Sequence, residues 1–148
     1  MKICIYGAGA IGGHLAARLH KAGAEVSVIA RGAHLAAIQA NGLTVHAVDG
    51  EHRAKVRASA DPIELGKQDV VFVTVKAPAL PAVAASIAPL LGSDTPVAFV
   101  MNGIPWWYFD SLPGPHQGKS LPRIDPGDAL RRALGPGQIG RTSCRERV

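Results

Sequence analysis

Short apolar runs alternate with helix-like segments along most of this chain. Four runs have the length of buried strands: Lys2–Tyr6, Glu25–Ala30, Asp69–Val75 and Pro96–Met101. Four segments have the pattern of helices: Ala10–Ala22, Ala33–Ala40, Leu80–Leu91 and Asp128–Leu134. Strands that alternate with helices favour a parallel sheet covered on both faces. We therefore expect an α/β protein with a doubly wound, mostly parallel sheet.

Two details of this pattern refine the expected elements. In the first helix, Ile11, Leu15 and Leu19 are spaced four residues apart, which predicts a stripe that faces the sheet. Between the second helix and the third strand, Leu43–Val48 and Arg53–Ala58 flank Asp49-Gly50-Glu51-His52. Asp-Gly between two alternating segments favours a hairpin. The doubly wound sheet is therefore expected to carry a hairpin insertion.

The composition changes after Phe109. Residues 110–140 are rich in glycine and proline and contain one predicted helix, so an irregular segment is expected to end a domain that spans residues 1–140. Residues 141–148 are charged at almost every other position and so cannot form a further buried apolar strand. We interpret them as a tail that is not native to the fold or is disordered. The sheet is then expected to lack its last strand or strands.

The overall composition excludes several classes of protein. Hydrophobic residues make up 47% of the 148 residues, and the net charge is +5, without a basic stripe that is interleaved with aromatic residues. An anionic small molecule is a better-matched partner than nucleic acid. No apolar run reaches the ~20 residues of a membrane span. The two cysteines, Cys4 and Cys144, favour a reducing cytoplasmic compartment over a disulfide framework.

The strongest motif follows the first apolar run directly. Gly7-Ala8-Gly9-Ala10-Ile11-Gly12 has the form Gly-x-Gly-x-x-Gly and lies between a predicted strand and a predicted helix. In this context Gly7 allows the tight turn, Gly9 leaves room for a pyrophosphate, and Gly12 lets the helix pack against the sheet. The backbone amides and the helix dipole attract phosphate groups. The motif therefore predicts a Rossmann-like dinucleotide-binding domain.

Arg31 indicates which dinucleotide this domain binds. NAD sites usually place an acidic residue at the end of the second strand, where it accepts hydrogen bonds from the ribose. The residues there are Ile29-Ala30-Arg31-Gly32. A guanidinium matches a phosphate in a bidentate manner, so Arg31 favours NADP(H) over NAD. FAD is the least favoured cofactor for the same reason.

Other candidate residues are less specific. Lys76 and Asn102 follow two predicted strands, at the edge of the sheet where ligands bind in open α/β folds. From their spacing alone, a ligand-binding role and an ordinary surface position are equally supported. The histidines have no metal-ligand spacing, so no metal is expected, and we interpret them as surface residues. These are His14, His20, His34, His46, His52 and His116.

Several of these motifs together resemble the ketopantoate reductase (2-dehydropantoate 2-reductase) family. They are Gly7–Gly13, Arg31-Gly32, Val75-Lys76-Ala77 and Asn102-Gly103-Ile104-Pro105-Trp106-Trp107. The resemblance covers about residues 1–140. It implies that the residues matching Gly7–Gly12 and Arg31 bind NADPH, and that Lys76 and Asn102 contact cofactor or substrate near the nicotinamide. The implied reaction is hydride transfer from NADPH to the ketone of 2-dehydropantoate, which gives pantoate for pantothenate and coenzyme A synthesis.

The chain departs from this family after Gly140. Family members continue into a helical domain that carries the proton-donating lysine, so no catalytic residue is assigned in this chain. It is expected to bind NADP(H) and to fail to reduce ketopantoate. Two alternatives stay open: an NADP-binding chain without chemistry, and an NADP-dependent dehydrogenase for another 2-keto or hydroxy acid. The aromatic residues 106–109 either line an interdomain cleft or pack as core, and a homo-oligomer is also open.

Overall fold

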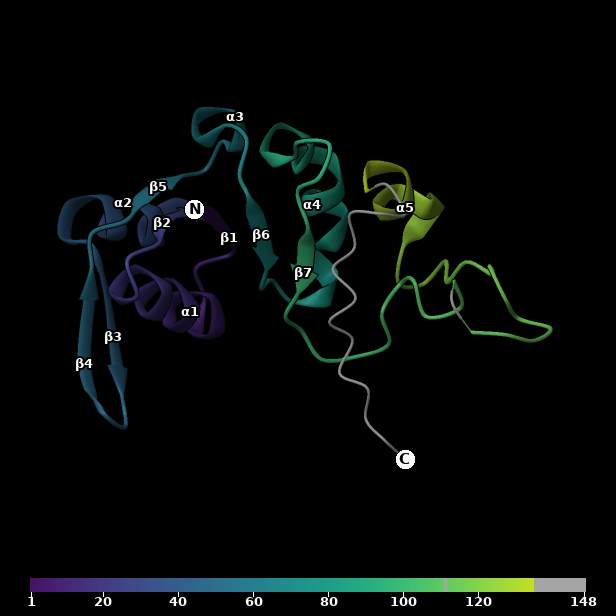
Figure 1. Cartoon of the computed structure of the whole chain (residues 1–148), viewed down its shortest axis with the longest axis horizontal. Coiled ribbons are helices and arrows are strands. Elements are labelled where there is room, and N and C mark those ends of the chain that lie inside the picture. The colour runs from purple at the N-terminus through teal and green to yellow at the C-terminus, as the bar shows by residue number, and fades with distance from the viewer. Residues whose placement is uncertain (111, 135–148) are drawn as a thin grey trace.

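The computed structural model describes residues 1–110 and 112–134. The main sheet contains β1 (Lys2–Tyr6), β2 (Glu25–Ile29), β5 (Arg57–Ser59), β6 (Val70–Val73) and β7 (Val97–Phe99). Its order is β5-β2-β1-β6-β7, and every neighbouring pair is parallel (Figure 1). The predicted α/β, Rossmann-like sheet is therefore confirmed. The strand expected after Gly140 and the tail at 141–148 lie outside the described residues.

The helices follow the expected order with altered bounds. They are α1 (Ala10–Lys21), α2 (Gly32–Asn41), α3 (Pro62–Leu65), α4 (Leu80–Ser86) and α5 (Ala129–Ala133), with 3-10 turns η1 (Ala77–Ala79), η2 (Ala88–Leu90) and η3 (Pro126–Asp128). The helix predicted over Leu80–Leu91 ends at Ser86. Pro89 has no amide hydrogen to continue the α-helical hydrogen bonds, and the chain tightens into η2.

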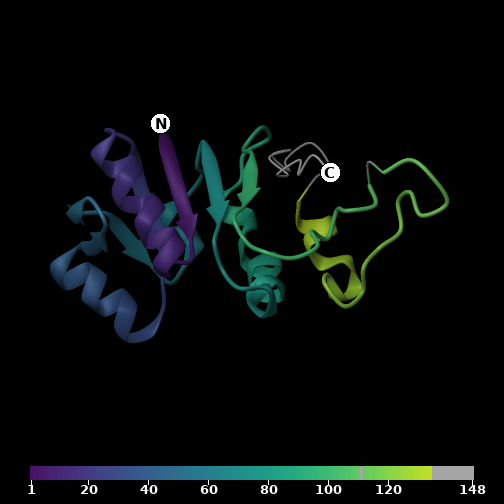
Figure 2. The same cartoon turned by 90° about the horizontal axis from the view of Figure 1, so that it is seen from below.

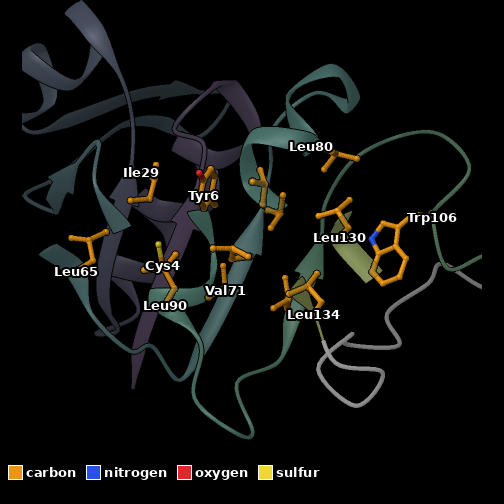
Figure 3. Packing of buried hydrophobic residues seen from close by; sticks show 14 residues of the cluster. Cys4, Tyr6, Ile29, Leu65, Val71, Leu80, Leu90, Trp106, Leu130 and Leu134 are labelled. Carbon is orange, nitrogen blue, oxygen red and sulfur yellow. The ribbon is translucent and has the colours of Figure 1, made fainter. Parts of the chain in front are cut away.

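Side chains alternate along the central strand and divide the core into two layers. Ile3 and Ile5 of β1 belong to a buried cluster that also contains residues of α1 and α2. Cys4 and Tyr6 point to the other face, into a cluster formed with α4 and α5 (Figure 3). Seen from below, α1 lies beside the N-terminal strand and α2 lies farther out, whereas α4 lies near β6 and β7 (Figure 2). The sheet is therefore covered on both faces.

The predicted stripe on the first helix is wrong in one important respect. Ile11 is 56% exposed, and Leu15 and Leu19 are only partly buried. The buried residues of α1 are instead small: Gly12, Gly13, Ala16 and Ala17. A Cβ atom at Gly12 would lie 2.0 Å from the carbonyl oxygen of Gly7. The helix packs so closely on the sheet that large side chains do not fit between them.

The hairpin forms, but its bounds differ from those predicted. Its strands are β3 (Leu43–Ala47) and β4 (Gly50–Ala54), and Ala47 pairs with Gly50, so the turn residues are Val48 and Asp49. The Asp49 carboxylate lies 2.6 Å from the Arg18 guanidinium, which ties the turn to α1. Arg57–Ser59, partly assigned to the hairpin from the sequence, instead pairs in parallel with β2. The open edge of β2 offers hydrogen-bond partners that the short hairpin does not.

Replacing Gly12 by alanine tests the close contact between α1 and the sheet. We expect Gly12→Ala to lower the free energy of unfolding by about 1–3 kcal/mol, because overpacking outweighs the gain in helix propensity. Gly9→Ala is the matched control, since a Cβ at Gly9 has no neighbour within 4 Å. Urea unfolding of the two variants measures the difference. Equal stabilities would show that the chain relaxes around the added methyl group.

Candidate nucleotide-binding site

The glycine motif forms the turn between β1 and α1. Gly7 has φ +108°, a conformation that side chains rarely adopt, and its amide donates a hydrogen bond to the carbonyl oxygen of Ile29 at 3.1 Å. A Cβ atom at Gly7 would lie 2.7 Å from Cγ1 of Val75. The sequence-based interpretation of Gly7 as a tight turn is therefore confirmed, and the turn lies directly against the end of β6.

Thr74 is a part of this turn that sequence reasoning missed. Its hydroxyl donates a hydrogen bond to the carbonyl oxygen of Gly7 at 2.5 Å. Its amide donates to the carbonyl oxygen of Tyr6 at 3.0 Å. The available signal was a lone hydroxyl residue within the apolar run 69–75. Thr74 connects the end of β6 to the glycine turn and so helps to hold the turn in place.

The first turn of α1 has the features of an anion-binding site. Gly9 is the N-cap residue, it offers no side chain to cap the helix, and the first turn contains no acidic residue. A Cβ atom at Gly9 would meet no other atom within 4 Å, so the space beyond this residue is open. Free amides and the positive end of the helix dipole therefore face a cradle that a side chain would fill. This geometry fits the pyrophosphate of a dinucleotide.

A cavity of about 440 Å³ lies on one side of the glycine turn. It is lined by Ile11 of α1, by residues 74–77 after β6, and by residues 100–102 after β7. Lys76 and Asn102 thus face the same cavity, as the edge of a parallel sheet predicts. The chain moves from β5 at one end of the sheet back to β6 beside β1, so the cavity lies at the point where the strand order reverses.

A second hollow of about 430 Å³ lies on the other side of the same turn. Its lining includes Gly9 and the histidines His14, His34 and His46. Arg31 is the N-cap residue of α2, is exposed, and lines neither hollow. Both hollows therefore border the start of α1, one at Ile11 and the other at Gly9 and Ala10. The structure brings Gly9 and Ala10 into the second hollow, with Lys76 and Asn102 in the first.

Three ionisable groups with shifted pKa values line neither hollow. The Arg18 hydrogen bond, helped by His52, holds the pKa of the Asp49 carboxyl well below its usual range. The Arg53 hydrogen bond likewise lowers the pKa of Glu51. Burial raises the pKa of the Cys4 thiol to about 12, so Cys4 stays protonated and serves as core. Asp49 and Glu51 thus stabilise the hairpin as carboxylates, and Cys4 is excluded as a nucleophile.

The aromatic residues after Asn102 divide between core and surface. Trp106 is 2% exposed and packs in the core, whereas Tyr108 is 49% exposed. Trp107 lies 5.1 Å from Phe99 of β7, measured between ring centroids. The core interpretation therefore holds for Trp106.

Neither a metal nor a membrane finds support in the described part of the chain. No group of three or more His, Cys, Asp or Glu residues within residues 1–110 and 112–134 is arranged to hold a metal ion. No helix in the same residues has the length and apolar character that crossing a membrane requires.

Comparison with known proteins places this geometry among related chains. The model of the family described as ketopantoate reductase PanE/ApbA matches residues 3–105. A 2-dehydropantoate 2-reductase from Mesorhizobium japonicum is 51% identical over 140 residues, which cover 94% of this chain and 43% of that protein. A 2-dehydropantoate 2-reductase from Lactococcus lactis is 34% identical over 70% of this chain and 34% of its own length. The chain thus spans less than half the length of these relatives.

Solved structures show the same relationship. A ketopantoate reductase homologue from Ralstonia solanacearum superposes with a TM-score of 0.87 at 51% identity, over 93% of this chain and 42% of that one. A ternary structure of D-mandelate dehydrogenase with NADH and anilino(oxo)acetate has a TM-score of 0.65 at 33% identity, over 71% of this chain and 35% of that one.

Changing Thr74 tests how the glycine turn is held. We expect Thr74→Val to lower the free energy of unfolding by about 1–2 kcal/mol, because the Gly7 carbonyl loses its donor without a change in side-chain volume. Thr74→Ser keeps the hydroxyl and is the control. Thermal and urea unfolding measure both variants. A valine variant as stable as the serine variant would mean that the hydroxyl contributes nothing to the turn.

Proposed function

Since this chain belongs to the ketopantoate reductase PanE/ApbA family, we propose that it forms the NADP(H)-binding part of an oxidoreductase that reduces 2-dehydropantoate to pantoate. The observation that carries the proposal is the uncapped start of α1 at Gly9, with open space beyond it, and the cavity that Ile11 of the same helix lines together with Lys76 and Asn102. The glycine turn can hold the phosphates of the cofactor, and the cavity leaves room for the nicotinamide and a ketone substrate.

Each residue of the glycine turn has a proposed role in holding the cofactor. The amides at the start of α1 bind the pyrophosphate, and Ala8, Gly9 and Ala10 line the surface along which it lies. Ile11 lines the cavity on the nicotinamide side and shields it with its exposed side chain. NADPH supplies the hydride when it is bound.

Arg31 is proposed to select NADP(H) over NAD(H). Its side chain is exposed, and no ion pair with it is found in the described part of the chain, so the guanidinium is available to an incoming phosphate. Arg31 is the N-cap residue of α2, so the free amides at the start of this helix add to the positive potential of its guanidinium. The 2′-phosphate of NADP(H) is the group that distinguishes the two cofactors and that matches this field.

Lys76 and Asn102 are proposed to orient the ketone end of the substrate. Lys76 brings a positive charge toward the carboxylate of a 2-keto acid, and Asn102 brings an amide donor and acceptor to the same cavity. Donors placed where negative charge develops on a ketone oxygen favour hydride transfer. The proton donor is not assigned to a residue of this chain. The cytoplasmic compartment, the domain bounds and a homo-oligomer stay predictions.

A second candidate is a dehydrogenase for another 2-keto acid. It is favoured by the similarity to D-mandelate dehydrogenase, whose solved structure holds NADH and an aryl-substituted oxoacetate. The two candidates share the fold and the cofactor turn and differ in what the cavity accepts.

Cofactor preference tests the role of Arg31. We expect Arg31→Met to weaken NADPH binding about 10- to 100-fold, because charge-assisted hydrogen bonds to the 2′-phosphate are lost. NADH binding should be unchanged, because NADH has no 2′-phosphate. Titration of bound-cofactor fluorescence measures both constants. The control is Arg123→Met, which removes an equal charge from an exposed site outside both hollows. Equal loss for NADPH and NADH would contradict a 2′-phosphate role.

Substrate profiling separates the two candidate activities. We expect the NADPH-bound chain to bind 2-dehydropantoate more tightly than phenylglyoxylate, the keto acid that corresponds to mandelate, as measured by titration of each keto acid. Gly9→Ala places a Cβ in open space within the fold and should abolish NADPH binding by blocking the pyrophosphate cradle. A preference for phenylglyoxylate, or for NADH, would instead support the second candidate.

A further inference from the structure

The segment that leaves the Lys76–Asn102 cavity carries both tryptophans of the chain. It runs from Asn102 to Asp110 and is called the Asn102–Asp110 loop below. The match to the family model ends at Pro105, within this loop. The 51% identical relative from Mesorhizobium japonicum matches 140 residues and so extends beyond it. The second half of the loop and helix α5 therefore lie outside the residues that the family model matches.

Asn102 depends on the rest of the loop for its position. Its side chain is exposed and makes no hydrogen bond to any of the residues that the structure describes. Four residues later, Trp106 is buried with an exposed fraction of 2%. Trp106 meets Phe99 of β7 edge to face, with 6.4 Å between ring centroids, and belongs to the same cluster as Leu130 and Leu134 (Figure 3). Trp106 is thus the nearest fixed point to Asn102 on its C-terminal side.

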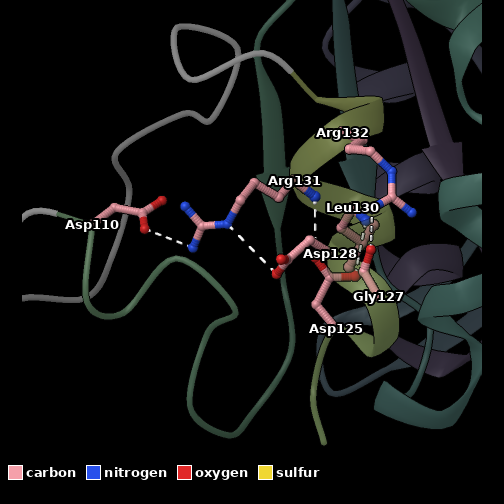
Figure 4. A network of polar contacts seen from close by, with 7 residues as sticks. All are labelled: Asp110, Asp125, Gly127, Asp128, Leu130, Arg131 and Arg132. Atoms are coloured by element: carbon pink, nitrogen blue, oxygen red, sulfur yellow. Dashed lines mark hydrogen bonds and ion pairs between the residues drawn. The ribbon is translucent and has the colours of Figure 1, made fainter. Parts of the chain in front are cut away.

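Arg131 of α5 contacts two points of the loop at once. Its guanidinium carbon lies 5.7 Å from the ring centroid of Trp106, within the range of a cation–π interaction. Its Nη2 atom lies 2.7 Å from Oδ1 of Asp110 (Figure 4). Both of these atoms are shielded from solvent, although the two side chains as a whole are about one-third exposed. A shielded pair is screened less by water and salt than a surface ion pair.

Two aspartates near the start of α5, Asp125 and Asp128, hold the backbone and side chain of Arg131. Asp125 is 3% exposed, and its carboxylate accepts hydrogen bonds from the amides of Leu130 at 2.9 Å and Arg131 at 3.1 Å. Asp128 lies 3.8 Å from Nε of Arg131 and adds a second negative charge (Figure 4). The guanidinium therefore projects from a fixed backbone toward the loop.

We propose that Arg131 is a positioning residue for the Asn102 end of the cavity and acts through Trp106 and Asp110. The inference rests on the proposed function for what the cavity holds. Arg131 touches neither hollow. Its influence is confined to the loop, so it alters the nicotinamide and keto-acid end of the site and leaves the phosphate end, formed by the glycine turn and Arg31, unchanged.

The test compares Arg131→Met with Arg131→Lys and with Arg132→Met. Methionine keeps the length of the side chain and removes its charge, and lysine restores the charge. Arg132 is an exposed neighbour whose guanidinium bonds the Gly127 carbonyl and does not contact the loop, so it is the matched control (Figure 4). Asp110→Asn removes the negative charge of the Arg131–Asp110 ion pair. Combining it with Arg131→Met completes a double-mutant cycle.

Tryptophan fluorescence and cofactor titration are two readouts that separate positioning from a general loss of structure. In the free protein, acrylamide quenching reports on Trp106 and Trp107, the chain's two tryptophans. With NADPH, energy transfer from these tryptophans to the reduced nicotinamide reports on the loop, and titration reports on cofactor affinity. We expect Arg131→Met to raise quenching, to lower energy transfer, and to change NADPH affinity by less than about twofold, as for a substitution that removes no cofactor contact.

The keto acid gives the third readout. We expect the Kd of 2-dehydropantoate, titrated into the NADPH-bound chain, to rise about tenfold in Arg131→Met, since a small displacement of an orienting residue has effects of this size. Arg131→Lys should recover part of each change, and Asp110→Asn should reproduce them without adding to Arg131→Met. Circular dichroism verifies that the variants fold. If Arg131→Met unfolds, Arg131→Lys and Asp110→Asn carry the same comparison.

The outcomes distinguish this inference from the proposed function. If the unchanged protein binds no NADPH, the proposed function fails, and quenching in the free protein still decides whether Arg131 sets the loop. If the unchanged protein binds NADPH and Arg131→Met behaves as Arg132→Met does, the positioning role is overturned. A parallel loss of NADPH affinity and energy transfer would also overturn it, because Arg131 would then act on the whole site.

Discussion

The site depends on one close contact, where the first turn of α1 meets the ends of β1 and β6. Gly12 lies against the Gly7 carbonyl, and the Thr74 hydroxyl bonds that same oxygen. Any side chain at Gly12 would occupy space already taken by backbone. The helix axis is therefore drawn toward the sheet, and the open amides of its first turn lie directly above the strand ends. The open start of α1 in this arrangement follows from packing.

The same contact explains why α1 buries only small residues. Gly13, Ala16 and Ala17 continue the close approach along the helix, and Ile11 is left facing the cavity. A hydrophobic residue at a helix start is normally expected to face the core. Here the helix is too close to the sheet for that, and an apolar side chain becomes available to the ligand side. The stability of the domain and the shape of its cavity thus have a common cause.

Beyond β7, side-chain contacts hold the Asn102–Asp110 loop in place of close backbone packing. The Asn102–Asp110 loop has no strand or long helix of its own and is held by Trp106 packing and by Arg131, which projects from the five-residue helix α5. The backbone of the glycine turn forms one end of the candidate site, while side-chain contacts hold the opposite end. Sites built in this way keep the cofactor constant and vary the substrate, because loops tolerate change and glycine turns do not.

Much of this arrangement could be predicted from the sequence. Apolar runs and the glycine motif determine a Rossmann-like parallel sheet, the turn at Gly7 and the edge where Lys76 and Asn102 meet. Local chemistry suffices there, because strand period and glycine conformation are properties of short segments. The hairpin turn at Val48-Asp49, the exposure of Ile11, and the roles of Thr74 and Arg131 were decided only by tertiary structure. Each depends on atoms brought together from distant parts of the chain, such as the contacts of Thr74 with Gly7 and of Arg131 with Trp106 and Asp110.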